Sequence, residues 1–179
     1  MDKGTVIKKY NLSRKQVDLI DSYIAKLTKS NQLHNLVGPS TIDVAWDRHI
    51  NDSLQLSEFI LKKNASIIDL GTGAGLPGAI LYIIGYSNIL LIDSKMKKIN
   101  FIKEFAHEQN LDIKTICTRV EKIKNQKFDF VTCRAFAPLV KLLDYSRFFT
   151  KKNTSLLFLK GRSVKKEIHE AKKSFSFEY

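Results

Sequence analysis

Five short apolar runs, each followed by a more polar stretch, constrain the fold of this chain more than any other feature. The intervening stretches 77–84, 95–110, 138–149 and 164–173, with a short one near Val120, are helix-like in composition. Near-continuous apolar strands that alternate with helices favour a mostly parallel sheet with helices on both faces, an α/β fold. The five predicted strands are Ile67–Leu70, Ile89–Asp93, Ile113–Cys117, Phe128–Cys133 and Leu156–Leu159.

The first 64 residues have a different, helical pattern. Ser13 and Gln16 fit a capping box, and apolar residues then recur at helical spacing, so we expect a helix over 13–29. A second helix is expected after Ser40 or Thr41, and 62–64 form a polar break. We therefore expect an N-terminal helical extension over 1–64, packed on a domain over 65–179 as one structural unit.

Four of the eight glycines fall between the first predicted strand and the helix after it, at positions 71, 73, 75 and 78. Glycines let a backbone turn sharply and let a ligand approach it without a Cβ in the way. In an open parallel sheet the ligand binds outside the carboxyl ends of the strands. We therefore expect a nucleotide-like cofactor here, with Gly71 and Gly73 among its contacts.

Two acidic residues bear on which cofactor binds. Asp93 ends the second predicted strand 22 residues after Gly71, close to the interval at which an acid accepts hydrogen bonds from ribose hydroxyls. Asp69 ends the strand before the loop, where it could face a cationic ligand such as the sulfonium of S-adenosylmethionine. Asp69, the glycines and Asp93 together favour that methyl donor. Because 73–78 also satisfy the dinucleotide fingerprint GxGxxG, a nicotinamide-dependent oxidoreductase remains the alternative.

The chain is basic, with a formal net charge of +12. Residues 1–64 carry 10 basic and 7 acidic residues, whereas residues 65–179 carry 20 and 11, so the excess lies on the predicted cofactor domain. Charge alone would support a third reading, a nucleic-acid-binding domain without enzymatic activity. Part of the excess is explained by a composition rich in lysine, isoleucine and asparagine.

Other classes of protein are disfavoured. No apolar run reaches the roughly 18–20 residues of a membrane span, and we expect a cytoplasmic protein. Cys117 and Cys133 are too few for a disulfide framework and have no metal-ligand spacing with histidine, so we expect two buried thiols and no metal.

The segment Ile67–Gly78, IIDLGTGAGLPG, resembles the first motif of the class I S-adenosylmethionine-dependent methyltransferases. More narrowly, the chain resembles the small-subunit ribosomal RNA methyltransferase G family, also called the glucose-inhibited division protein B family. The matching motifs follow in order over about 33–161: Asn35-Leu36, WDRHINDSLQL (46–56), LLIDSKMKKINFIKEF (90–105), TRVEK (118–122), FDFVTCRAFAPL (128–139) and LFLKG (157–161). Gly38-Pro39 departs from the family pattern, in which a threonine-containing stretch commonly follows Asn-Leu.

The resemblance implies methylation of guanine N7 in the 530 loop of 16S ribosomal RNA, on free RNA or on the small ribosomal subunit, by a monomer. A class I sheet ends with an antiparallel strand pair, of which Phe175–Tyr179 could supply at most the first member. The cofactor positions that the resemblance implies are Gly71, Leu76, Asp93, Ser94, Val120, Glu121 and Arg134.

Direct displacement at N7 needs no general base, so we expect holding donor and acceptor in line to dominate catalysis. Arg134, at the carboxyl end of the fourth predicted strand, is expected to contact the cofactor or the guanine O6 edge. For Arg48, His49 and Asp52 we expect a structural role in docking the N-terminal helices. The lysines expected to contact RNA phosphates are Lys95, Lys97, Lys98 and Lys160.

Overall fold

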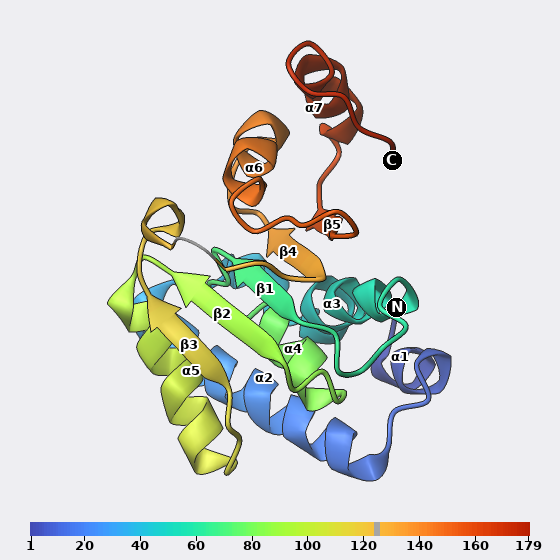
Figure 1. Cartoon of the computed structure of the whole chain (residues 1–179). Coiled ribbons are helices and arrows are strands. Elements are labelled where there is room, and N and C mark those ends of the chain that lie inside the picture. Colours follow the sequence, from blue (N-terminus) through green and yellow to red (C-terminus); the bar gives the residue numbers. More distant parts are fainter. Residues whose placement is uncertain (124–125) are drawn as a thin grey trace.

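A computed structural model describes residues 1–123 and 126–179, and its centre is one sheet of five parallel strands (Figure 1). The strand order β3-β2-β1-β4-β5 reverses direction between β1 and β4. The prediction of a mostly parallel α/β sheet is confirmed, and each strand overlaps its predicted run. The strands are β1 (Ile67–Leu70), β2 (Ile89–Asp93), β3 (Lys114–Cys117), β4 (Phe130–Arg134) and β5 (Ser155–Leu159).

Helices cover both faces of the sheet because successive strand residues point to opposite sides. Ile67 and Leu91 join a buried cluster with α4 (Gly78–Ile83) and α5 (Met96–Glu108). Ile68 and Ile92 join a second cluster on the other face, which contains Leu142 of α6 (Leu139–Ser146). The helices of the second half are α6 (Leu139–Ser146), the 3-10 turn η4 (Val120–Lys122) and α7 (Val164–Ala171), which packs beside α6.

The N-terminal segment begins with α1 (Lys3–Lys9), which the sequence patterns do not predict, and continues into α2 (Arg14–His34). Ser13 caps α2 through the predicted capping box. The helix runs past its predicted end to Asn35, whose φ of 45° closes it in the left-handed conformation.

The predicted second helix is broken into unlike turns. These are the 3-10 turn η1 (Pro39–Thr41), the π-helix η2 (Trp46–Asn51), the short α3 (Asp52–Leu54) and the 3-10 turn η3 (Gln55–Glu58).

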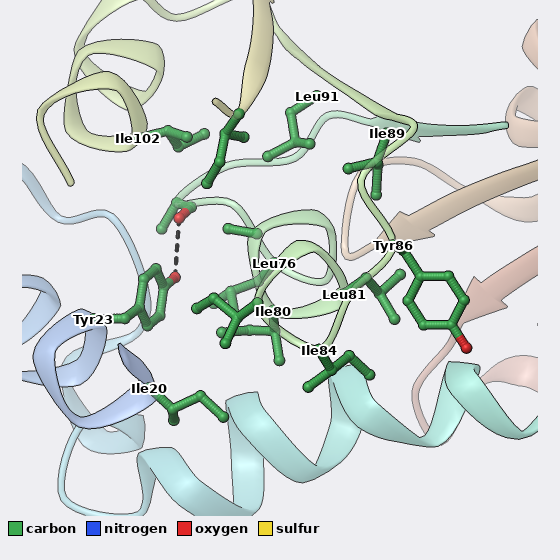
Figure 2. Packing of buried hydrophobic residues seen from close by; sticks show 14 of the residues in the cluster. Ile20, Tyr23, Leu76, Ile80, Leu81, Ile84, Tyr86, Ile89, Leu91 and Ile102 are labelled. Atoms are coloured by element: carbon green, nitrogen blue, oxygen red, sulfur yellow. Dashed lines mark hydrogen bonds between the residues drawn. The ribbon is translucent and has the colours of Figure 1, made fainter. Parts of the chain in front are cut away.

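One hydrophobic cluster contains residues of the N-terminal helices and residues of the helices beside the sheet. It contains Ile20 and Leu27 of α2 together with Ile80 of α4 and Phe105 of α5. Tyr23 is fully buried in it, and its hydroxyl donates a hydrogen bond to the carbonyl of Ala74 in the glycine loop at 2.9 Å, the dashed line in Figure 2. The N-terminal helices therefore support the loop directly.

The C-terminal residues of the chain lie beside the β5 edge of the sheet. Residues 175–179 form no strand; Phe177 and Tyr179 instead border a groove with α6, α7 and β5. No helix among the described residues combines the length and apolar character that crossing a bilayer requires.

Candidate active site

Strand register brings three separate parts of the sequence to one edge of the sheet. Leu70 pairs with Ile92 of β2 and with Cys133 of β4. The residues that follow each of them, Gly71, Asp93 and Arg134, therefore lie in one row beyond the carboxyl ends of the central strands. This is where the strand order reverses, the usual ligand position in an open parallel sheet.

The glycine loop has a backbone that only glycine adopts readily. Gly71 and Gly73 have φ values of +63° and +60°. A Cβ on Gly71 would also lie 2.3 Å from Cδ2 of Phe136, whose ring packs directly against it. The two glycines border a cavity of about 980 Å³, near the upper end of the roughly 300–1,000 Å³ typical of ligand sites.

The cavity also has walls from distant parts of the chain. Its other sides are formed by residues 36–38 and Thr41, by Arg48 and His49 on η2, and by residues 159–162 at and just after the end of β5. Of the residues predicted from sequence, those that border it are Gly71, Gly73, Leu76, Lys98, Arg134 and Lys160.

Asp69, which the sequence predicts to contact the cofactor, does not border this cavity. Its carboxylate is fully buried and accepts hydrogen bonds from the hydroxyls of Thr72 and Thr132 and from the Gly78 N–H. Burial raises the pKa of Asp69 to about 6 even though these three donors favour the ionised form. Asp69 therefore ties the loop to the start of α4 and to β4.

Asp93 lies across from the loop. Its Oδ2 accepts the Gly73 N–H at 3.0 Å, its Oδ1 accepts the Lys95 N–H at 2.8 Å, and Lys98 Nζ lies 3.8 Å from Oδ2. A carboxylate has about four acceptor positions, so Asp93 retains capacity for ribose hydroxyls. Ser94 follows it and is exposed.

Arg134 reaches from the end of β4 to the N-terminal segment. Its Nη1 donates to the carbonyl of Arg48 at 2.9 Å and contacts Nδ1 of His49 at 3.0 Å. Nε2 of His49 in turn lies 2.8 Å from the hydroxyl of Thr41. Burial first, and then the positive charge of Arg134, lower the pKa of His49 to about 4.

The four predicted RNA-contacting lysines occupy different environments. Lys95 and Lys97 are exposed near the start of α5, whereas Lys98 is half-buried at the cavity beside Asp93. Lys160 is engaged within the protein: its Nζ lies 2.6 Å from Glu167 Oε2 and donates to the carbonyl of Ala137 at 2.9 Å. Its contacts tie the loop after β4 to α7.

The expected adenine-side residues lie at η4. The Thr118 N–H donates to the carbonyl of Asp93 at 2.9 Å, which holds this segment beside the end of β2. Val120 is buried and Glu121 is exposed.

Sequence reasoning missed Thr41 and Arg162, which border the cavity, and Phe136, whose ring packs against Gly71. Phe136 follows Ala135, whose φ of +50° is unusual for alanine, and it lies within the segment FDFVTCRAFAPL, which could have drawn notice to it. Cys133 is buried as predicted, which raises its thiol pKa to about 12, whereas Cys117 is half-buried.

The same arrangement of sheet and helices occurs in solved methyltransferases. The fold is similar to that of ribosomal protein L11 methylase from Lactobacillus delbrueckii subsp. bulgaricus, with a TM-score of 0.60 and 20% identity over 69% of this chain and 66% of that one. The protein therefore has the Rossmann-like fold of the class I methyltransferases.

The chain belongs to the rRNA small subunit methyltransferase G family, whose model matches residues 16–179. A relative of that name in Orientia tsutsugamushi (strain Ikeda) is 38% identical over 170 residues, covering 95% of this chain and 85% of the relative. Another in Rickettsia prowazekii (strain Madrid E) is 37% identical over 163 residues, covering 91% and 84%. The chain is accordingly an S-adenosylmethionine-dependent rRNA methyltransferase, and the oxidoreductase alternative gains no support.

Proposed function

We propose that this chain methylates N7 of a guanine in the 530 loop of 16S ribosomal RNA. The observation that carries the proposal is the cavity at the carboxyl edge of the sheet. The glycine loop, Arg134 and residues of the N-terminal segment all line this one cavity.

The residues at the loop fit S-adenosylmethionine. Gly71 and Gly73 present backbone without side chains, and the Asp93 carboxylate lies 3.0 Å from the Gly73 N–H, where it can accept from a ribose diol. We propose Leu76, Ser94, Val120 and Glu121 as further contacts. When bound, this cofactor supplies a methyl group activated on a positively charged sulfur.

Arg134 would act at the acceptor end. A guanidinium has five N–H donors, and the two on Nη1 already meet the Arg48 carbonyl and His49 Nδ1. Nε and Nη2 make no hydrogen bond to the described residues, and because Arg134 borders the cavity, guanine O6 or a cofactor carboxylate could accept from them there.

The chain needs no general base for this reaction, because guanine N7 already presents a lone pair. Holding the two reactants in line can contribute up to about 7–11 kcal/mol in favourable cases. Walls that come from separate parts of the chain, among them the glycine loop, η2 and the residues at the end of β5, are suited to that task.

We propose that Lys95 and Lys97 contact RNA phosphates, since both are exposed near the start of α5. Lys98 and Lys160 border the cavity and would face RNA only at its mouth. We further propose that the protein acts as a monomer in the cytoplasm, where small subunits are assembled.

The test is methyl transfer to small subunits that lack the modification, with the product identified as N7-methylguanosine by mass spectrometry of digested RNA. Asp93→Ala should weaken S-adenosylmethionine binding, measured by calorimetry, about tenfold to a hundredfold, because it removes a charged acceptor. Arg134→Ala should greatly reduce methyl transfer. A weaker affinity for S-adenosylmethionine would show that Arg134 contacts the cofactor, whereas a raised KM for RNA would show that it contacts the acceptor.

Arg147→Ala is the matched control, since Arg147 lies just after α6 and pairs with Asp144 at the surface. It should leave transfer unchanged. Two results would overturn the proposal: absence of binding heat with S-adenosylmethionine in a folded protein, or methylation of free nucleotides or DNA while small subunits are ignored.

A further inference from the structure

The hydrogen bonds around His49 leave only one arrangement of protons. Arginine has donors and no acceptor, so Nδ1 of His49 must accept from Arg134 Nη1 at 3.0 Å. The ring is then neutral with its proton on Nε2, which donates to Thr41 Oγ1 at 2.8 Å. The Thr41 hydroxyl donates onward to the carbonyl of Gly38 at 2.6 Å. A directed chain of donors thus runs from Arg134 to the 38–41 turn.

The position of His49 in the chain makes this arrangement rigid. His49 is 4% exposed and lies within the π-helix η2, a kind of turn that is frequent at functional sites. Its own carbonyl accepts the Ser53 hydroxyl at 2.7 Å. Consecutive residues of one turn, Arg48 and His49, therefore hold the two N–H groups of a single guanidinium nitrogen.

Neither of the two groups that accept hydrogen bonds from Arg134 Nη1 carries a negative charge. A carbonyl and a neutral imidazole fix the orientation of Arg134 without neutralising its charge, whereas a carboxylate at the same distance would pair with it. Burial and the charges of Arg134 and Arg48 keep the imidazole neutral, with a pKa lowered to about 4. Burial lowers the pKa of Arg134, and the charge of Arg48 acts in the same direction, whereas Tyr23, Asp52 and Asp69 oppose this shift.

We infer that His49 is a positioning residue, which acts through Arg134 by holding its guanidinium at the cavity with its charge intact. This inference rests on the proposed role of Arg134 in methyl transfer. The histidine touches neither methyl donor nor acceptor in this role, and it is distinct from a general base.

Two substitutions separate this role from a purely structural one. In His49→Asn the amide oxygen falls near the position of Nδ1 and can still accept from Arg134, while the contact with Thr41 is lost. In His49→Gln the side-chain amide reaches toward Thr41, while the acceptor at the Nδ1 position is lost. Single-turnover transfer should fall about tenfold in His49→Gln, the loss expected for a hydrogen bond to a charged group, and Asn should rescue most of it.

A readout without catalysis is the side-chain ¹⁵N NMR spectrum of the free protein. The His49 signals, assigned by their disappearance in His49→Asn, should show the Nε2–H tautomer and no titration between pH 5 and 8. The signals of the other three histidines, His34, His107 and His169, should remain in His49→Asn and so confirm the assignment. A Nδ1–H tautomer, or titration near the ordinary value of about 6.5, would overturn the inference.

A double-mutant cycle with Arg134→Lys completes the test. If His49 acts through Arg134, His49→Gln should cause much less further loss in the Arg134→Lys background than in the wild type. Equal losses in both backgrounds, or equal damage from Asn and Gln at position 49, would refute the positioning role. Failure of the wild type to methylate small subunits would instead refute the proposed function, so the two failures are distinguishable.

Discussion

Removing one hydroxyl should test whether the N-terminal helices support the cofactor loop. Tyr23→Phe deletes the donor that meets the Ala74 carbonyl at 2.9 Å, deep inside the protein. The phenyl ring keeps its edge contacts with Phe101 and Phe105, whose centroids lie 5.9 and 5.4 Å away. The change in stability therefore isolates a single hydrogen bond between α2 and the loop.

The expected loss combines the hydrogen bond with the cost of leaving a buried carbonyl without this donor, about 2 kcal/mol in all. For a domain of this size that corresponds to a fall in Tm of about 4–8 °C. Because Ala74 borders the cavity, S-adenosylmethionine should also bind several-fold more weakly. Urea unfolding measures the first effect, and calorimetric titration measures the second.

Tyr82→Phe is the matched control. The Tyr82 hydroxyl accepts the Asp112 N–H at 3.2 Å at an exposed site, so water can replace it and the free energy of unfolding should change by less than about 0.5 kcal/mol. If Tyr23→Phe were no more destabilising than this control, the loop would not depend on α2, and the reasoning would be wrong.

Three further predictions follow from the site. Burial raises the pKa of Asp69 to about 6, so the folded state binds this proton more tightly than the unfolded state does. As the pH rises from 4 to 6, the free energy of unfolding of the wild type should therefore fall by about 1–3 kcal/mol relative to that of Asp69→Asn. Parallel pH profiles of the two proteins would contradict this. Gly71→Ala should destabilise the protein in urea unfolding and weaken cofactor binding in calorimetry, whereas Gly161→Ala, with open space around it, should leave the free energy of unfolding unchanged. Lys160→Met should lower the free energy of unfolding in urea by about 1–2 kcal/mol, because it leaves Glu167 without its partner. Lys97→Ala should leave the free energy of unfolding unchanged, and the slope of log K for RNA binding against log salt concentration should fall by about one phosphate contact.

The sequence by itself determined the sheet and the ligand loop. The bounds of β1 and β2 coincide with their predicted runs, and the capping box starts α2 where expected. These features are local: apolar runs report burial, and glycines and capping residues report backbone conformation within a few positions.

Only the tertiary structure decided which polar side chains face the cavity. The Asp69 carboxylate is buried because donors from the loop, α4 and β4 surround it. Lys160 forms an ion pair with Glu167 on α7. His49 meets Arg134 across 85 positions of sequence. A residue's own neighbours in sequence cannot specify such partners, because strand register and helix packing bring them together from distant segments.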